Sequence, residues 1–590
     1  MLKHFEVTKG RFGRFARELK ELLHPKNAPL SRLSVFAAPG RIPFAEATGG
    51  SYRPAAEGEE FGPGWSTHWF RVDYQVPADW RGEEVLLHFD SSSEGCVWKD
   101  GVPLQGLTSY NAGPEDIRSY FTLHAKARGG ESGTLHVEAA INGLTGLCDG
   151  MGRLQKQQLG HLRHARLVTR DRAVWDLLWD FVVIKEIAEC LPADGPHQPH
   201  ALATANEIVN AVVIGDRSTY AAGRGIARRF FAAKNGTRNH HVSAIGHAHI
   251  DTAWLWPLAE ARRKCYRSFS TAIRMMETYP DYKFVCSQAQ QLDWIREGQP
   301  GLWAKIKDMA GRGRFVPVGG TWVEPDCNIP NGESLVRQFL VGQRFFKKEF
   351  GAYCREFWNP DVFGYSGALP QIINGAGIRF FLTQKLSWNQ FNPPASSTFL
   401  WEGIDGSRVL THFPPSDTYN GFVSVEELQR HYTRFKDRER ASESCLLFGY
   451  GDGGGGPTEE MMERVRRLRD VPGLPDLEIR PPSEFFARCE ADLKDPVVWT
   501  GELYFEKHRG TYTTHAANKR DNRRCEEALH DVEFLATLAF LRGDAYPHDD
   551  INALWRTVLL NQFHDIIPGS SIREVYEDSA RDYARVLDET

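Results

Sequence analysis

The sequence lacks the features that mark three broad classes of protein. Its ten cysteines among 590 residues include no Cys-x-x-Cys pair, so a disulfide scaffold and a cysteine-ligated zinc site are disfavoured. Asp180 and Lys185 interrupt the apolar stretch WDLLWDFVVIKEI, and no run reaches the roughly 18 apolar residues that a membrane-spanning helix needs. Lys and Arg number 71 against 76 Asp and Glu, which gives a net charge of −5. This balance gives no reason to expect nucleic acid as a partner.

The composition that is present is that of a folded, multidomain protein. Hydrophobic residues make up 41% and charged residues 25% of the chain, close to ordinary globular usage. At about 150 residues per domain, the length suggests about four domains. The N-terminus is basic and amphipathic but has no apolar core, so we interpret it as a helix rather than a signal peptide. Together with the scattered thiols, this predicts a cytoplasmic protein with no membrane attachment.

The hydrophobic pattern predicts a multidomain α/β protein. Residues 1–150 read as a leading helix and a β-sandwich, because residues 70–76 alternate between apolar and polar and Asp100-Gly101 is typical of a hairpin turn. Residues 151–240 read as a helical connector. Residues 241–500 alternate between short apolar runs and helical segments, which predicts a parallel sheet or barrel-like (β/α) domain. Residues 501–590 carry long apolar stripes and predict a helical bundle.

The first candidate site follows the first apolar run of the alternating region. In an extended chain His247, His249 and Asp251 would share one face at a strand end. Two imidazoles and a carboxylate suit a borderline ion such as zinc or cobalt. The alternative is a hydrogen-bonded histidine pair in the core, and one of the histidines could instead orient a ligand or touch substrate.

Two aspartates follow later apolar runs of the same region. Asp361, in WNPDVFGY, could be a metal ligand, a nucleophile or an N-cap. Asp452, in FGYGDGGGGP, lies in a glycine-rich segment that no Gly-Lys-Ser/Thr follows, which disfavours a phosphate loop. We interpret the glycines as giving Asp452 close access to a ligand, with a plain turn as the alternative.

His564 lies at a predicted helix end just before Pro-Gly. A structural histidine is the default interpretation, unless the helices dock on the mouth of the barrel. Further candidates are assigned to packing or supporting roles: Glu324, Asp326, His412, Tyr419, His508, Tyr512 and His515.

Four segments in the same order resemble glycoside hydrolase family 38, the retaining α-mannosidases, and most closely its cytosolic-type branch. They are GHAHIDTAWLWP, FWNPDVFGYSGALPQI, FGYGDGGGGPT and LLNQFHD. QAQQLDW, FVPVGGTWVE, FLTQKLSWN and GTYTTHA are also similar to that branch. The resemblance spans most of the chain and implies a (β/α) barrel-like catalytic domain followed by a three-helix bundle.

The resemblance implies one divalent metal ion, Zn²⁺ or Co²⁺. By position, His249 and Asp251 match the first two ligands, Asp361 matches the residue that is both ligand and nucleophile, and His564 matches the ligand from the helical bundle. His247 is not a ligand in this pattern.

The resemblance also implies the substrate contacts and the second carboxyl group. Trp254 matches the aromatic residue that packs against the sugar. Apart from the resemblance, His247 and Tyr419 are the further expected substrate-binding residues. Asp452 lies in the segment of the proposed acid/base, although this glycine-rich form differs from the Asp-Asp form of Golgi and lysosomal relatives. Asp361 would attack the anomeric carbon and Asp452 would protonate the leaving oxygen.

The expected function is therefore hydrolysis of terminal α-linked mannose from oligosaccharides or glycans. Family members continue into a C-terminal β-rich region, whereas this chain stops at Thr590. One alternative is another metal-dependent barrel hydrolase of the amidohydrolase or deacetylase type, which predicts further histidine ligands or a bridging lysine at later strand ends. A second is a truncated form that binds sugar without turnover. The sequence leaves open whether the chain forms a homo-oligomer.

Overall fold

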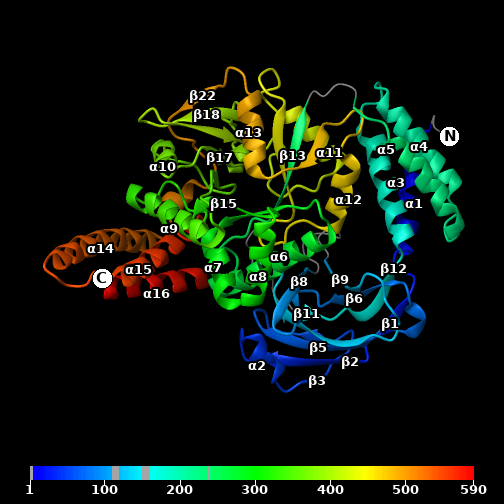
Figure 1. Ribbon diagram of the computed structural model, residues 1–590, viewed down its shortest axis with the longest axis horizontal. Helices are drawn as coiled ribbons and strands as arrows, with labels where there is room; N and C mark the ends of the chain where they lie inside the picture. Colours follow the sequence, from blue (N-terminus) through cyan, green and yellow to red (C-terminus); the bar gives the residue numbers. More distant parts are fainter. Residues whose placement is uncertain (1–3, 109–117, 149–159, 236–239) are drawn as a thin grey trace.

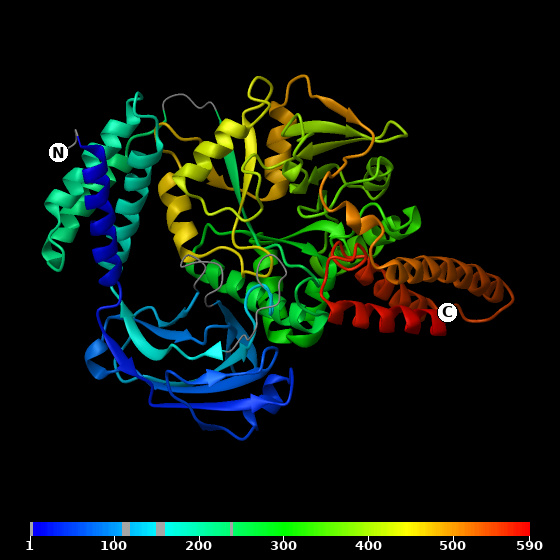
Figure 2. The same ribbon diagram turned by 180° about the vertical axis from the view of Figure 1, so that it is seen from behind.

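The computed structural model describes residues 4–108, 118–148, 160–235 and 240–590. A β-sandwich lies below a central α/β domain in these views, a group of helices flanks that domain on one side, and a helical arm projects from the side opposite these helices (Figures 1 and 2). The N-terminus lies near the flanking helices, and residue 590 lies on the arm (Figure 1).

Four helices flank the central domain, three of them in the region expected to be a helical connector. They are α1 (Phe5–Glu21), α3 (Arg172–Cys190), α4 (His197–Ala211) and α5 (Tyr220–Phe231). Phe12 and Phe15 of α1 meet the ring of Phe181 on α3 edge-on, with centroids 5.8 and 4.7 Å apart. Burying these rings stabilises the docking of the N-terminal helix.

Two antiparallel sheets form the N-terminal β-sandwich. One has the order β1-β12-β6-β9 and the other β3-β2-β5-β10-β7-β8. Alternate residues such as Phe70, Val72 and Leu87 are fully buried between them, as the period-two pattern predicts. The strands are β1 (Asn27–Pro29), β2 (Arg32–Ala38), β3 (Arg53–Pro54), β5 (Thr67–Gln75), β6 (Glu84–Asp90), β7 (Glu94–Lys99), β8 (Val102–Thr108), β9 (Tyr120–His124), β10 (Ser132–Ala140) and β12 (His164–Arg170), with β4 (Glu60–Phe61) pairing β11 (Gly160–His161).

The sandwich extends beyond the boundary expected at residue 150. Strand β12 pairs with β1 on one side and with β6 on the other, so residues up to Arg170 belong to this sheet. The sequence pattern missed the strand because its alternation is short and begins and ends with charged or imidazole side chains. The expected boundary itself lies outside the described residues. The predicted hairpin is present at Asp100 and Gly101, both with positive φ.

The apolar runs of residues 241–500 form the strands of the central domain. One sheet has the parallel order β15-β14-β13-β20, with β21 also pairing β13. The other has the order β16-β17-β19-β18-β22, in which β18 is antiparallel to β19, and β15 contacts β16. The strands are β13 (His241–His247), β14 (Phe284–Gln288), β15 (Phe315–Thr321), β16 (Glu356–Trp358), β17 (Phe380–Leu382), β18 (Thr398–Glu402), β19 (Arg408–His412), β20 (Glu443–Phe448), β21 (Asp476–Ile479) and β22 (Val498–Thr500).

Helices lie between most of these strands. They are α6 (Leu258–Thr278), α7 (Ala289–Gly298), α8 (Pro300–Gly311), α9 (Gly332–Phe350), α10 (Leu369–Gly375), α11 (Val425–Arg434), α12 (Glu459–Leu468) and α13 (Pro482–Asp492). Of these, α8, α9, α10, α12 and α13 pack against strands of the two sheets. Helix α9 begins where the Asn331 side chain accepts the Ser334 amide and ends at Gly351 with φ +79°. The strand–helix alternation predicted for this region is present, and the carboxyl ends of the parallel strands gather at one edge.

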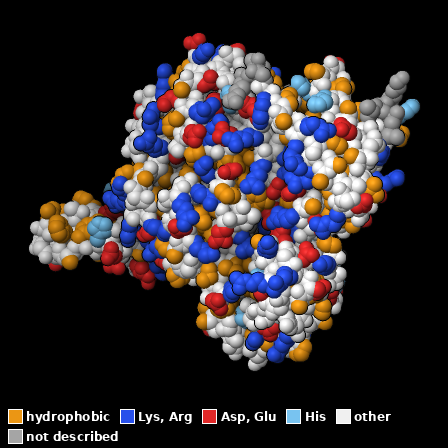
Figure 3. All heavy atoms as spheres, turned by 45° about the vertical axis from the view of Figure 1, so that its right-hand side comes forward, with side chains coloured by type: hydrophobic (Ala, Val, Ile, Leu, Met, Phe, Trp, Pro, Cys, Tyr) orange, Lys and Arg blue, Asp and Glu red, His pale blue; other side chains and the backbone are white. Residues whose placement is uncertain are grey.

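Helices α14 (Ala516–Leu541), α15 (His548–Asn561) and α16 (Arg573–Glu589) pack against one another and form the arm. Arg337 of α9 pairs with Glu533 of α14, and its guanidinium lies over the ring of Trp555 on α15, which ties the arm to the α/β domain. Apolar side chains gather on the outer part of the arm (Figure 3) and include Phe534, Leu535, Leu538, Phe540 and Leu541. Among the described helices, none combines the length and the apolar character required to cross a bilayer.

Candidate functional site

Four side chains from distant parts of the chain converge where the strands end. Each of His249, Asp251, Asp361 and His564 offers one ligand atom, these atoms lie within 4.8 Å of one another, and all four residues are buried. His249 and Asp251 follow β13, and Asp361 follows β16. His564 follows α15, so the arm does dock on the strand ends, as the sequence analysis required for a functional role of this histidine.

Glu324, in the loop after β15, orients both imidazoles of the cluster. Its Oε2 lies 3.0 Å from His249 Nδ1, and its backbone oxygen lies 2.9 Å from His564 Nδ1. Ser287 donates to the other carboxylate oxygen at 2.5 Å. Since Nδ1 of each ring lies against Glu324, the Nε2 atom of each ring faces the acidic side chains of the cluster. His249 Nε2 and His564 Nε2 lie 2.9 and 3.4 Å from Asp251 Oδ1.

The electrostatics of the cluster favour a cation. Burial opposes a charge on His249, but the Glu324 and Asp251 carboxylates outweigh it and hold its pKa well above the ordinary value. Burial would also raise the pKa of Asp251, yet the neighbouring His249 lowers it below its usual range. Asp251 thus keeps its negative charge, and a positive charge beside it would be stabilised.

The donor set fits a divalent metal ion. His564 Nε2 is fully buried and, among the described residues, has no hydrogen-bond partner, a cost that a metal–ligand bond would remove. Two imidazoles and two carboxylates match the preference of zinc or cobalt. No other group of three or more His, Cys, Asp or Glu side chains in the described part of the chain could hold a metal ion.

Lys385, after β17, fixes the orientation of Asp361. Its Nζ lies 2.6 Å from Asp361 Oδ1 and 4.0 Å from the ring centre of Trp388. Burial lowers the pKa of Lys385, but the Asp361 carboxylate outweighs this effect and raises it above the ordinary value. The ammonium therefore stays charged and occupies one oxygen of Asp361, whereas Oδ2 faces His564 Nε2 at 3.9 Å.

Asp452 lies in a loop of residues 449–457 after β20, which we call the glycine loop. Tyr419 OH donates to its Oδ1 at 3.0 Å, and Asn420 Nδ2 donates to its Oδ2 at 3.4 Å. Burial and then the nearby charge of Asp251 raise the pKa of Asp452 to about 6. Asp452 and Gly453 have φ of +50° and +79°, a backbone path that favours glycine. A carboxyl group with this pKa can both donate and accept a proton near neutrality.

His247 does not join the cluster. Its side chain is fully buried, Trp358 Nε1 donates to its Nε2 at 3.3 Å, and burial lowers its pKa to about 3. The expected convergence of His247 with His249 and Asp251 required an extended chain, but β13 ends at His247 and the alternation stops there. Trp254 is partly buried and meets Trp256 edge-on, with centroids 5.6 Å apart.

The remaining sequence candidates serve mostly as supports. Asp326 caps its own loop by accepting the amides of Asn328 and Ile329. His412 is buried, with Thr398 Oγ1 at 2.9 Å from its Nδ1 and the Cys445 amide donating to its Nε2. These two groups form no part of the cluster.

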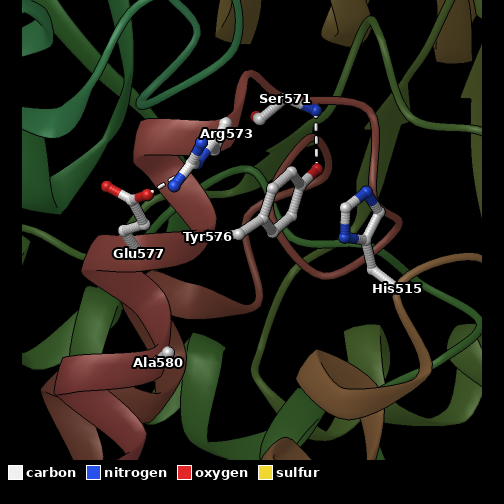
Figure 4. Close-up of a pocket in the computed structure, with 6 residues that line it drawn as sticks. All are labelled: His515, Ser571, Arg573, Tyr576, Glu577 and Ala580. Atoms are coloured by element: carbon white, nitrogen blue, oxygen red, sulfur yellow. Dashed lines mark hydrogen bonds and ion pairs between the residues drawn. The ribbon is translucent and has the colours of Figure 1, made fainter.

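The aromatic candidates after residue 505 divide between the site and the surface. His508 meets the ring of Phe363 edge-on with centroids 4.7 Å apart, beside Asp361. Tyr512 is 39% exposed and lies at the surface. His515 lines a separate pocket with α16, where its ring stacks on Tyr576 at 3.9 Å (Figure 4).

Sequence reasoning did not single out Lys385 or Asp565. Lys385 had a usable signal, because it follows the apolar run RFFLTQ as the other site residues follow theirs. The later strand-end lysine expected for an amidohydrolase is thus present, but it pairs with an aspartate. Asp565 is buried beside His564, and Ser570 donates to its carboxylate. Burial raises the pKa of Asp565 well above its ordinary value.

Three domain families match successive parts of the chain. Residues 28–168 match the alpha-mannosidase jelly roll domain, residues 239–502 the glycosyl hydrolases family 38 N-terminal domain, and residues 506–590 the alpha mannosidase middle domain. The match of the first family agrees with the strand pairing up to β12.

Similar proteins extend over nearly the whole chain. Alpha-mannosidase 2C1 of Homo sapiens is 46% identical over 99% of this chain and 57% of its own length. Alpha-mannosidase G of Dictyostelium discoideum is 41% identical over 100% of this chain and 55% of its own length. The chain thus spans a little more than half the length of these relatives. An alpha-mannosidase from Enterococcus faecalis V583 shares the fold with a TM-score of 0.53, at 20% identity over 59% of this chain and 41% of that one.

Proposed function

Because this chain belongs to glycoside hydrolase family 38, we propose that it is a retaining α-mannosidase that removes terminal α-linked mannose from oligosaccharides or glycans. The observation that carries the proposal is a pair of buried carboxyl groups in different environments. Asp361 is paired with Lys385 and faces the cluster, whereas Asp452 has a pKa of about 6. Such a pair supplies the nucleophile and the acid that this hydrolysis needs.

The first half of the reaction uses both carboxyl groups. Asp361, oriented by its ion pair with Lys385, attacks the anomeric carbon of mannose and forms an ester bond to it. The bond from that carbon to the leaving oxygen breaks, and Asp452 gives its proton to this oxygen. Tyr419 and Asn420, which donate to the Asp452 carboxylate, stabilise the charge that the proton transfer leaves behind.

The second half reverses these roles. The Asp452 carboxylate takes a proton from a water molecule, whose oxygen attacks the anomeric carbon. The ester bond breaks, the electron pair returns to Asp361, and mannose leaves with the configuration it had in the substrate. The pKa of about 6 lets Asp452 serve both halves near neutral pH.

His249, Asp251, Asp361 and His564 are the residues that would hold one Zn²⁺ or Co²⁺ ion. When bound, the ion would supply Lewis-acid binding of the sugar hydroxyl groups. Glu324 lies against Nδ1 of both imidazoles and so orients the two rings with Nε2 toward the other ligand residues. Trp254, beside this cluster in the chain, would pack against the apolar face of the sugar.

The finer architecture and the setting belong to the same proposal. We infer that the central domain is a (β/α) barrel derivative, that α14, α15 and α16 form a three-helix bundle, and that the four units lie near the expected boundaries, with the sandwich running to about residue 170. The cytoplasm is the proposed location. All ten cysteines lie in described segments and are free thiols, which fits a reducing compartment.

Hydrolysis of an aryl α-mannoside by the purified chain tests this function. We would compare the protein as purified, chelated, and reloaded with Zn²⁺ or Co²⁺, with Asp361→Asn as the variant and exposed Glu297→Gln as the matched control. We expect metal-dependent turnover that falls by more than about 1,000-fold in Asp361→Asn, and NMR should detect the α-anomer as the first product. A folded, metal-loaded chain without turnover would refute the proposal and favour sugar binding without hydrolysis.

A further inference from the structure

The N-terminal β-sandwich reaches across to the glycine loop that carries Asp452. The guanidinium of Arg118 donates to the backbone oxygens of Gly454 at 3.0 Å, Gly456 at 2.9 Å and Pro457 at 3.3 Å. The backbone of Arg118 is itself paired with Thr108, at the end of β8, by hydrogen bonds of 2.7 and 3.1 Å. One side chain of the sandwich thus holds three carbonyl groups of the other domain.

A second contact from the sandwich supports the same loop from beneath. Glu94 of β7 accepts from Lys264 Nζ at 2.8 Å, and the backbone oxygen of Leu144 accepts from it at 3.0 Å. Lys264 is fully buried, and its stem lies so close to Gly453 that a Cβ there would come within 2.7 Å of Lys264 Cδ. Residues of the sandwich therefore fix Lys264, whose side chain packs against Gly453 of the loop.

The glycine loop has few means of holding its own shape. Its internal backbone hydrogen bonds run from Gly454 to Gly451 and between Tyr450 and Gly456. Gly453, Gly455 and Gly456 all have positive φ, and glycine loses more conformational freedom on ordering than any other residue. A five-donor guanidinium in a fixed fork is well suited to order such a segment. At Gly455 a Cβ would come within 2.3 Å of Arg118 Nη1, so the glycine makes room for the guanidinium.

We propose that Arg118 is a positioning residue for Asp452, and that the N-terminal β-sandwich thereby takes part in acid catalysis. The inference rests on the acid/base role of Asp452 proposed above. Arg118 acts through the loop backbone: its hydrogen bonds hold residues 454–457. The Gly451 amide donates to Asn420 Oδ1 at 2.8 Å and the Gly453 amide to the His249 backbone oxygen at 3.1 Å, so that the loop carrying Asp452 is fixed from both sides. Without Arg118 the loop samples other conformations, and the proton is no longer presented to the leaving oxygen.

The leaving group distinguishes this role from a general loss of stability. An aryl α-mannoside with a 2,4-dinitrophenyl leaving group needs little protonation, whereas a phenyl leaving group needs the acid. For Arg118→Ala we expect kcat/KM to fall about 10- to 100-fold with the phenyl substrate and less than about threefold with the dinitrophenyl substrate. Arg118→Lys, which keeps the charge but loses the fork, should lie between wild type and Arg118→Ala.

Arg166→Ala is the matched control, because Arg166 is also in the sandwich but pairs with Glu57 in the same domain. Arg166→Ala should leave kcat/KM unchanged with both substrates. Hydrogen exchange provides a readout that does not depend on activity: amides of residues 449–457 should exchange faster in Arg118→Ala than in wild type or in Arg166→Ala.

The outcomes separate the two proposals. If wild type hydrolyses both substrates and Arg118→Ala slows them equally or not at all, the inference about Arg118 is overturned and the proposed function stands. If wild type hydrolyses neither, the proposed function fails for this chain, and unchanged exchange of the glycine loop would overturn the anchoring by Arg118 as well. If Arg118→Ala does not fold, Arg118→Lys decides by the same two measurements.

Discussion

Glu356 makes a measurable prediction about stability and pH. It is the first residue of β16, the strand that leads to Asp361. Its side chain is buried, and its Oε1 has no hydrogen-bond partner among the described residues. Burial raises the pKa of Glu356 from its ordinary value of 4.5 to about 7, because the charged form is poorly solvated there.

The sign of the effect follows from proton binding. Since the folded state binds the proton more tightly than the unfolded state, the free energy of unfolding falls as the pH rises from about 4.5 and levels off above about 7. A shift of about 2.5 pKa units is worth about 3.4 kcal/mol in full. Ionisation of Glu356 thus lowers the free energy of unfolding by about 1.4 kcal/mol at pH 5.5 and by about 3.3 kcal/mol at pH 8.

Glu356→Gln removes this cost, because the amide is neutral at every pH. The free energy of unfolding measured in urea should therefore be higher in the variant than in wild type, and this difference should be about 2 kcal/mol larger at pH 8 than at pH 5.5. Glu297→Gln, at an exposed position, is the control and should show no such pH-dependent gain. An equal change at both pH values, or a net loss at pH 8, would refute the argument from burial.

Three further predictions concern the site. In wild type, kcat/KM should fall as the pH rises through about 6, because Asp452 must carry its proton. Tyr419→Phe removes a hydrogen-bond donor to the charged form of Asp452, so the fall in the pH–rate profile should begin about one pH unit higher. Glu324→Gln should weaken metal affinity about 10- to 100-fold in a competition with a chelator, whereas unchanged affinity would exclude the orienting role. Lys385→Met should lower kcat at least about tenfold with little change in KM, because Asp361 loses the partner that orients it; a change confined to KM would contradict this role.

The fold was largely predictable because its elements are encoded locally. The alternation of residues 70–76 marked β5, and the apolar runs of residues 241–500 marked the parallel strands. Period and turn residues are short-range signals that a single sequence carries. Strand β12 was missed because its alternation is short and ends in charged or imidazole side chains, and its pairing with β1 and β6 becomes visible only in the assembled sheet.

The site was predictable where residue type and position at a strand end coincided. His249, Asp251 and Asp361 met both conditions, and the structure gathers them. His564 could be placed only by the family resemblance, because its strand-end neighbours lie at least 200 residues earlier. Glu324 was assigned only a supporting role, because its contacts with both His249 and His564 form only when three loops of the folded chain come together.

The scattered origin of the cluster also orders events during synthesis of the chain. His564 follows Asp251 by 313 residues, which takes about 15 to 60 s at about 5–20 residues per second. Throughout that interval the nascent chain has its first ligands without the last. With the metal ion proposed above, retention of the ion would therefore show that the helical arm has been made and has docked on the strand ends.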